Sequence, residues 1–222
     1  MPPKLTRRKA LQLTGAGMVG LGTGYLWHRP HAPNFRCRVG TFQQSSYIHH
    51  LRDTLIRGLQ EFPHVVQRFK GGRVVLKPNL VEFHRGRPIN TDVRLVAASA
   101  EAFRHLGAAE VIVAEGPGHM RDTGFLMEHS GLGALLRDAK VKFVDLNVDD
   151  VHYVSLRGNR TGLKRMPFAR TVLDCELLVS LAKMKTHHWA GVTLTMKNLF
   201  GTVPGAVAGW PKNPLHWGGI SN

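Results

Sequence analysis

One short stretch of this chain of 222 residues concentrates side chains that could do chemistry. It reads KMKTHHWAGVTLTMKNLFG over residues 183–201, with three lysines, two adjacent histidines and one asparagine. Lysine ammonium groups bind phosphate or carboxylate, and histidine imidazoles transfer protons or ligate metals. The stretch directly follows CELLVSLA (175–182), a run that is apolar enough to form a buried strand. We therefore expect a cationic site at the end of that strand.

Three other apolar segments also end in polar side chains. VVLKPNLV contains Lys77 and Asn79, EVIVAEGPG contains Glu115, and VKFVDLN ends with Asp145 and Asn147. In open parallel sheets, ligands bind outside the carboxyl ends of the strands. We therefore expect these side chains to line one shared rim together with the basic stretch.

The residue types at this rim suit the binding of a small anion. The expected ligand-binding residues are Lys77, Asn79, Glu115, Lys185, Thr186 and Asn198. A lysine that is buried among other cations has a lowered pKa and can act as a nucleophile or a base, and Lys197 is the candidate for that role. His187 and His188 point in opposite directions in an extended chain, so one of them is expected to face the site.

A metal ion is the second kind of ligand that the rim could hold. His187 is the candidate metal ligand, but a metal site needs several convergent donors. His119, Glu115 and Asp145 are the candidates for the other donors. The sequence therefore leaves an anion site and a metal site both open.

Strand-like and helix-like segments alternate along the chain and would position these groups. Apolar runs predict strands, and apolar residues at helical spacing predict helices. The expected strands are residues 37–42, 71–81, 110–118, 141–147 and 175–182, and the expected helices are residues 47–62, 91–107 and 131–139. The stretch from 152 to 170 is basic and irregular. Apolar strands separated by helices predict an α/β fold, with a mostly parallel sheet and helices on both faces.

The composition limits the class of protein. Hydrophobic residues make up 43% and charged residues 20%, which excludes a disordered chain. With 30 Lys and Arg against 15 Asp and Glu, the net charge of +15 permits binding to nucleic acid, an anionic membrane surface or small anions. Nucleic acid is the least supported partner, because no basic motif has interleaved aromatic residues. Cys37 and Cys175 form no Cys-x-x-Cys motif, so we expect no iron–sulfur cluster in this chain.

Residues 1–31 have the features of an export segment. A basic head is followed by an uncharged, Gly-rich apolar stretch over residues 10–27. Residues 6–11, TRRKAL, resemble a twin-arginine signal, although Ala10 stands where the pattern has Phe. The resemblance implies that the export machinery carries the folded protein across the cytoplasmic membrane, to a periplasmic or membrane-anchored location. An amphipathic first helix is the alternative, which the glycines there disfavour.

The motifs of the chain are together similar to one family. VVLKPNLV, TDVRLVAASAEAFRHLGAAEVIVAEG and LLVSLAKMKTHHWAGVTLTMKNLFGTVPG resemble the domain of unknown function 362 family (DUF362), over residues 37–222. The family pattern runs from a Lys-Pro-Asn strand end to Lys-x-Lys-Thr-His and Lys-Asn-x-x-Gly motifs, all of which occur here. Its members are uncharacterised, and some carry a ferredoxin-like iron–sulfur segment that this chain lacks. Because the pattern usually continues further, we expect the domain to be incomplete at its C-terminus.

A shorter stretch is similar to part of the nickel-pincer lactate racemases. The spacing from His187 to Lys197, flanked by Ala-Gly at 190–191 and Pro-Gly at 204–205, fits a segment of those enzymes. The likeness implies that the His187 imidazole transfers a proton or ligates a metal. It also implies that Lys197 holds a nucleotide cofactor, so that both residues would be catalytic.

Two classes of function remain open. The first is an exported, cofactor-dependent enzyme domain that acts on a small anionic ligand, with a metal or a lysine-linked nucleotide as cofactor. The second is a non-catalytic accessory module that holds a metal or a cofactor for a redox partner. Removal of the Lys197 amine would abolish a chemical step in the first class, and it would only weaken ligand retention in the second.

Overall fold

The structure is a computed structural model that describes residues 37–47, 49–118, 121–157, 163–187 and 191–209, together with Lys212 and Leu215. The chain divides into two compact units, Met1–Val39 and Gly40–Asn222, and the second unit contains the sheets and helices given below. The predicted export segment, residues 1–31, lies outside the described residues and stays a prediction. Among the described residues, no helix combines the length and the apolar character needed to cross a membrane.

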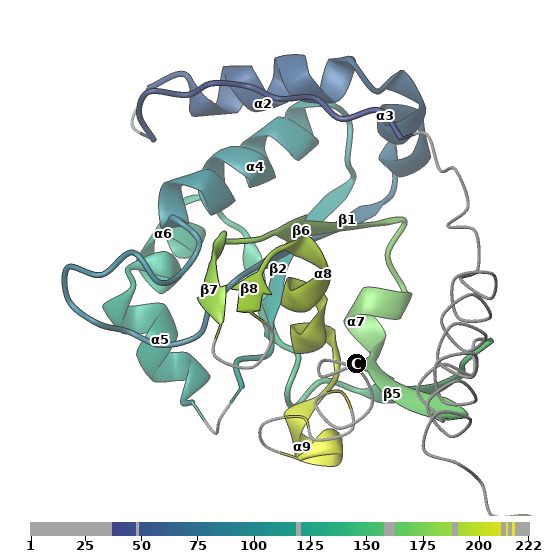
Figure 1. The fold of residues 1–222 in the computed structure, drawn as a ribbon. Coiled ribbons are helices and arrows are strands. Elements are labelled where there is room, and N and C mark those ends of the chain that lie inside the picture. The colour runs from purple at the N-terminus through teal and green to yellow at the C-terminus, as the bar shows by residue number, and fades with distance from the viewer. Residues whose placement is uncertain are drawn as a thin grey trace, which may run out of the picture. The chain divides into compact units, whose positions relative to one another are not determined.

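A four-stranded parallel sheet organises the second unit (Figure 1). In spatial order its strands are β3 (Lys142–Asp145), β2 (Glu110–Glu115), β1 (Arg73–Pro78) and β6 (Leu177–Leu181). Val75 of β1 lies opposite Ile112 on one side and Leu178 on the other. Val74, Val75 and Leu76 are fully buried, because β1 is covered at both edges and on both faces. The predicted α/β fold with a parallel sheet is confirmed.

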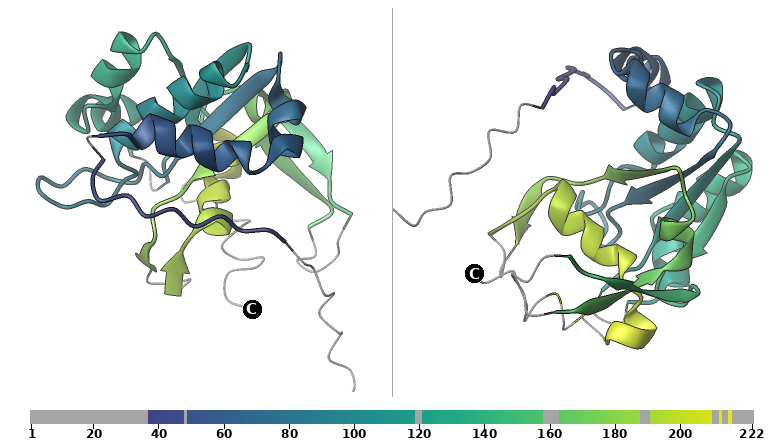
Figure 2. Two further views of the ribbon diagram at one scale, coloured as in Figure 1. Left: turned by 90° about the horizontal axis from the view of Figure 1, so that it is seen from above. Right: turned by 90° about the vertical axis from the view of Figure 1, so that its right-hand side faces the viewer.

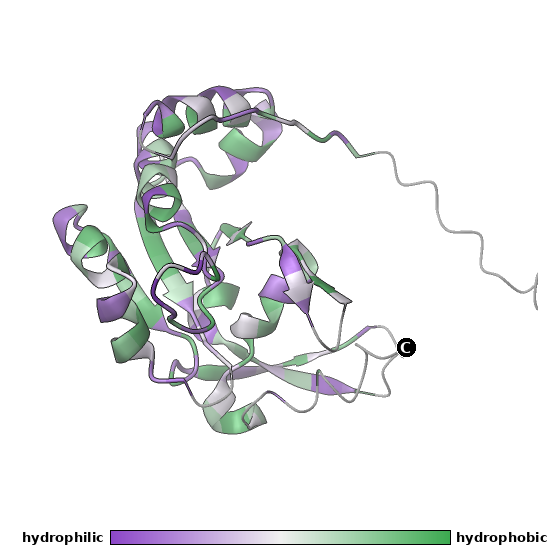
Figure 3. Ribbon diagram, turned by 60° about the vertical axis from the view of Figure 1, so that its left-hand side comes forward, coloured by the Kyte–Doolittle hydropathy of each residue, from purple (hydrophilic) through white to green (hydrophobic). Residues whose placement is uncertain are grey.

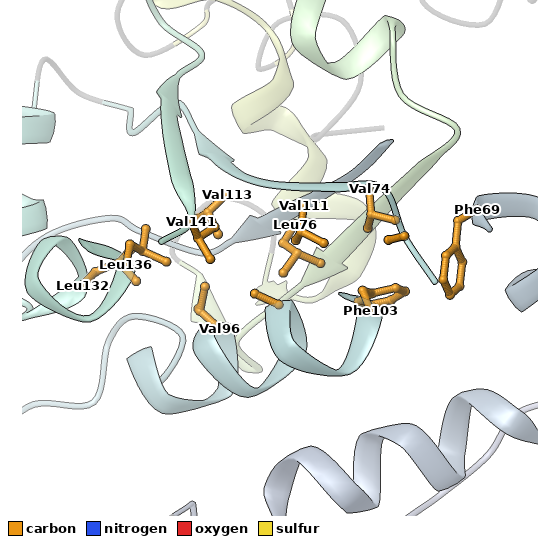
Figure 4. Packing of buried hydrophobic residues seen from close by; sticks show 12 residues of the cluster. Phe69, Val74, Leu76, Val96, Phe103, Val111, Val113, Leu132, Leu136 and Val141 are labelled. Atoms are coloured by element: carbon orange, nitrogen blue, oxygen red, sulfur yellow. The ribbon is translucent and has the colours of Figure 1, made fainter. Parts of the chain in front are cut away.

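One face of the sheet is covered by α4 (Val93–His105) and α6 (Leu132–Asp138). Val74 and Leu76 share one buried cluster with Val96 and Phe103 of α4 (Figure 4). Helix α4 begins after Asp92, whose side chain accepts a hydrogen bond from the Arg94 N–H at 2.9 Å and so caps the helix. Two further helices precede the sheet in the chain, α2 (Leu51–Gln60) and α3 (Pro63–Phe69), and α2 contacts α4.

The opposite face of the sheet carries a smaller buried cluster. Val75 and Ile112 pack there with Leu146 and Ala169. Val172 of α7 (Arg170–Leu173) packs against this cluster, and α8 (Thr195–Asn198) contacts β6. The views in Figures 1 and 2 place α2 and α4 on one side of the sheet and α8 on the other. Helices therefore cover both faces, as predicted.

Two antiparallel strand pairs lie outside the parallel sheet. One pairs β4 (Val151–Ser155) with β5 (Arg165–Ala169), and the other pairs β7 (Lys185–His187) with β8 (Gly191–Thr193). The remaining elements are α5 (Thr123–His129), η1 (Leu199–Thr202) and α9 (Gly205–Ala208). Figure 3 shows mostly hydrophobic central strands and helices of mixed hydropathy, as expected where one helix face is buried.

Some predicted elements differ from the structure. Residues 37–42 form no strand, so that prediction was wrong, and Val39 and Phe42 are 77% and 51% exposed. The helix predicted over residues 47–62 begins at Leu51, and a second helix begins at Pro63, because proline fits the first position of a helix. The stretch predicted to be irregular contains the antiparallel pair of β4 and β5.

Candidate functional site

A pocket of about 690 Å³ lies at the carboxyl ends of β1 and β2, and residues of β7, β8 and α8 also line it. We call it the strand-end pocket. The eight residues predicted as ligand-binding or catalytic all border it, namely Lys77, Asn79, Glu115, Lys185, Thr186, His187, Lys197 and Asn198. Asp145 and Asn147, which were also expected at this rim, do not line it. The structure thus brings together groups that lie far apart in the sequence. The chemical roles assigned to them stay predictions.

A buried ion pair forms the floor of the strand-end pocket. Lys77 Nζ lies 2.7 Å from both carboxylate oxygens of Glu115, and both side chains are almost completely buried. The Glu115 oxygens also accept hydrogen bonds from the backbone N–H groups of Gly116 at 2.8 Å and Leu80 at 3.3 Å. Burial lowers the pKa of Lys77, and the Glu115 charge opposes that shift. The charge of Lys77 is therefore already matched within the protein.

Asn198 joins α8 to the ends of two strands. Its Oδ1 accepts from Asn79 Nδ2 at 3.1 Å and from Lys77 Nζ at 3.4 Å. Its Nδ2 donates to the backbone carbonyl of Lys77 at 3.1 Å and to Ser180 Oγ at 2.9 Å. Because α8 buries this amide against β1 and β6, Asn198 fixes the helix that presents Lys197 to the pocket.

Two glycines allow the backbone to pass close to the ion pair. A Cβ added at Gly201 would lie 2.5 Å from Lys77 Nζ, and one added at Gly116 would lie 2.7 Å from the carbonyl oxygen of Gly201. Contacts that close do not occur between real side chains and their neighbours. The Lys-Asn-x-x-Gly motif therefore combines a pocket lysine, a buried amide and a glycine that leaves room for Lys77.

The β7–β8 hairpin has one face toward the pocket and one toward solvent. Lys185 lies opposite Thr193 in the register, and both line the pocket. Thr186 lies opposite Val192 on the more exposed face, because successive side chains alternate along a strand, and Val192 is 46% exposed. Thr186 nevertheless borders the pocket as well. Thr193 is buried, and its Oγ1 has no hydrogen-bond partner among the described residues. The hairpin thus presents an ammonium group and an unsatisfied hydroxyl to the pocket.

Among the described residues, two of the pocket lysines have neutral groups as neighbours. Lys185 Nζ donates to Asn79 Oδ1 at 2.7 Å and to the carbonyl of Ile89 at 2.9 Å, and Lys197 Nζ lies 4.2 Å from the centre of the Phe200 ring. Within the described part of the chain, neither lysine forms a salt bridge. Burial lowers the pKa of Lys185 to about 8, and burial followed by the Lys77 charge lowers that of Lys197.

Lys212 is a pocket residue that the sequence reasoning missed. Its Nζ donates to the carbonyl of Gly116 at 2.8 Å, and the residue is 3% exposed. Burial lowers its pKa to about 7, although the nearby Glu115 carboxylate opposes the shift. A single lysine between prolines, in WPKNP, follows no strand or helix pattern, so no signal in the sequence marked it.

The candidate metal ligands that the structure describes do not form a metal-binding cluster. Among the described residues, no three His, Cys, Asp or Glu side chains come close enough together to hold a metal ion. Asp145 accepts a hydrogen bond from the Asn147 N–H at 2.9 Å and does not line the pocket. His119 and His188 lie outside the described residues. The metal-binding role predicted for His187 therefore stays a prediction.

A model of one protein family matches residues 74–216, and its description is "Domain of unknown function (DUF362)". The chain belongs to the DUF362 family. The motifs that carried the resemblance contribute Lys77, Asn79, Lys185, Lys197 and Asn198 to the strand-end pocket of this DUF362 domain.

A relative of this DUF362 chain is a thylakoid-associated protein of Synechocystis sp.. The two are 28% identical over 179 residues, which is 78% of this chain and 51% of the relative. The chain therefore spans about half the length of that relative. No solved structure matches the chain. These comparisons do not bear on the local likeness to lactate racemases.

Proposed function

We propose that the strand-end pocket of this DUF362 domain binds a small ligand through a phosphate or carboxylate group. The observation that carries the proposal is an excess of cations in the pocket. Four lysines line it, and of these Lys77 is paired with Glu115, whereas Lys185 and Lys197 form no salt bridge with another described residue. Holding ammonium groups in a half-buried pocket disfavours their charged form, and an anion would restore it.

Two further features support an anionic ligand. Lys185 and Lys212 have pKa values lowered to about 8 and about 7, so an anion placed beside them would raise both. The buried Thr193 hydroxyl, which lacks a partner among the described residues, can donate a hydrogen bond to a ligand oxygen. A phosphate or carboxylate would therefore satisfy a polar group that the described part of the protein leaves unsatisfied.

Calorimetry on the unmodified chain and on two lysine variants tests the proposal. The titrants are inorganic phosphate and acetate, at pH 7 and low salt. Lys185→Met should weaken binding of the preferred anion by about tenfold, the loss expected for one charge-assisted hydrogen bond. Lys142→Met is the matched control, because Lys142 is exposed at the start of β3, and it should bind like the unmodified chain. Equal affinities in the two variants would contradict the proposal.

We propose further that His187 and Lys197 act on the bound ligand, with a metal or a lysine-linked nucleotide as cofactor. Both residues border the strand-end pocket, and burial lowers the pKa of Lys197, which favours its neutral, nucleophilic form. Mass spectrometry and elemental analysis on protein purified from its own host test this. An adduct on Lys197 supports an enzyme domain. A stoichiometric metal without an adduct supports the alternative, an accessory module for a redox partner.

We also propose that the protein works outside the cytoplasmic membrane. The twin-arginine-like residues 6–11 and the thylakoid association stated in the relative's name support this location. Fractionation of cells that express the full chain tests it. Replacement of Arg7 and Arg8 by lysine should retain the protein in the cytoplasm if the twin-arginine route exports it.

A further inference from the structure

A second hollow adjoins the strand-end pocket. It has a volume of about 390 Å³ and is lined by Glu82, Phe83, His84, Arg121, Asp122, Phe125 and Leu126. We call it the ring pocket. Glu82 and Arg121 line both hollows, so the two are direct neighbours. The strand-end pocket is cationic, whereas the ring pocket presents two phenyl rings.

The aromatic side chains of the ring pocket are exposed but held in place. Phe125 is 48% exposed and Phe83 is 36% exposed, which is high for phenylalanine. The Phe125 ring stacks on the His129 ring, with 3.9 Å between centroids, and Phe83 lies 5.6 Å from the same imidazole. Asp122 caps α5 by accepting a hydrogen bond from the Phe125 N–H at 2.9 Å. The rings therefore form a positioned platform on which a planar group can stack.

The border between the two hollows is an exposed ion pair. Arg121 Nη2 lies 2.6 Å from Glu82 Oε2, and Glu82 Oε1 lies 2.6 Å from His84 Nε2. The side chain of Arg121 is 47% exposed and that of Glu82 is 30% exposed, so water screens the pair and its net stabilisation is small. Arg121 can therefore turn toward a ligand that reaches from one hollow into the other.

We infer that the two hollows bind one ligand, a phosphate ester that carries an aromatic ring, with the phosphate beside Lys185 and the ring against Phe125. The inference rests on the proposed anion binding and specifies the class of ligand. A pocket of about 690 Å³ is of the size that holds drug-sized ligands, and a bare phosphate would leave most of it empty. Phosphate beside ammonium groups and an aromatic ring beside phenyl rings match the chemistry of the two hollows.

The test compares three ligands that share a phosphate: inorganic phosphate, ribose 5-phosphate and adenosine 5′-monophosphate. Their dissociation constants are measured by calorimetry on the full chain. Adenosine 5′-monophosphate should bind about tenfold tighter than ribose 5-phosphate, the gain expected from stacking one base. Phe125→Ala should remove this gain and leave the affinity for ribose 5-phosphate unchanged. Phe125→Tyr should keep the gain, because it retains the ring.

A matched control is Tyr153→Ala, which removes a 47% exposed aromatic ring from β4 and should change none of the three affinities. Equal binding of ribose 5-phosphate and adenosine 5′-monophosphate would overturn the inference and leave the proposed anion site intact. An equal loss for all three ligands in Phe125→Ala would overturn it as well, since the ring would then act on the phosphate site. If none of the three phosphates binds the unmodified chain, both this inference and the proposed binding of phosphate in the strand-end pocket are overturned.

Discussion

At the scale of single residues, the charges of Lys77 and Glu115 are both buried, and each compensates the other. Removing one partner from such a pair leaves a buried charge without compensation, which costs about 3–5 kcal/mol. Glu115→Gln should therefore lower the free energy of unfolding by about that amount. Urea denaturation followed by circular dichroism at pH 7 measures it.

Glu110 supplies the control for this prediction from the same strand. It pairs with Arg73 of β1 at 2.6 Å, but both side chains are about two-fifths exposed. An exposed pair contributes about 0–1 kcal/mol, so Glu110→Gln should change stability little. If the two variants unfold at the same urea concentration, burial does not distinguish the two pairs and our account of the site floor is incorrect.

The glycine next to the ion pair gives a second test at the same scale. Gly201→Ala places a methyl group against Lys77 and Glu115, and overpacking of this kind costs about 1–3 kcal/mol. A Cβ at Gly118 would meet no atom within 4 Å, so Gly118→Ala should be nearly neutral. Thermal unfolding of the two variants should show a lower midpoint for Gly201→Ala alone.

At the scale of elements, the β7–β8 hairpin determines which groups the pocket receives from its outer wall. Thr193→Val removes the buried hydroxyl that lacks a partner among the described residues and keeps the shape of the side chain. The free protein should become more stable by about 1 kcal/mol, while its affinity for the preferred anion falls. Urea denaturation and calorimetry measure the two effects on the same preparation.

Thr202 provides the contrasting variant. It is also buried, but its Oγ1 donates to the carbonyl of Leu199 at 2.7 Å. Thr202→Val should therefore destabilise the protein by about 1 kcal/mol, because the carbonyl of Leu199 loses its hydrogen bond from the Thr202 hydroxyl. If both valine variants lower the free energy of unfolding, the Thr193 hydroxyl is not an unsatisfied group.

The sequence predicted well those strands that consist of a nearly uninterrupted run of apolar residues. Strands β1, β2 and β6 are continuous apolar runs with both faces covered, so the pattern alone identifies them. Strand β5 contains Pro167, which argues against a strand in a sheet interior, and it is tolerated in a two-stranded pair. The run at residues 37–42 has the composition of a strand, but the described structure supplies no partner strand for it.

The site was predictable to the extent that its residues follow strands. Lys77, Glu115 and Lys185 stand at or just after strand ends, and parallel topology brings such positions to one edge. Lys212 and Arg121 line the pocket but belong to neither a helix nor a strand, so no local pattern in the sequence marks them. The pairing of Lys77 with Glu115 depends on the neighbour order of β1 and β2, which the sequence does not state.

At the scale of the whole molecule, the lowered lysine pKa values make stability depend on pH. Lys212 has a pKa of about 7 in the folded state and an ordinary value near 10.5 when unfolded. Between these values the unfolded chain binds more protons, so the contribution of Lys212 to folding stability rises with pH, by at most about 1.4 kcal/mol per pH unit. Lys185, with a pKa of about 8, also contributes folding stability that rises with pH above pH 8.

Urea denaturation at pH 7, 8 and 9 measures this dependence. Lys212→Met should show a smaller increase in unfolding free energy with pH than the unmodified chain, because methionine carries no titrating group. Lys142→Met keeps the pocket lysines and should show the full increase. An unchanged slope in Lys212→Met would contradict the burial of that ammonium group.

Strand β6 lies beside β1 in the sheet, although β2 and β3 come between them in the chain. While a ribosome is still making the intervening residues, one edge of β1 has no hydrogen-bonded neighbour. Open strand edges promote pairing with other chains and hence aggregation. During synthesis this edge of β1 therefore stays open to pairing with other chains until residues 177–181 have left the exit tunnel.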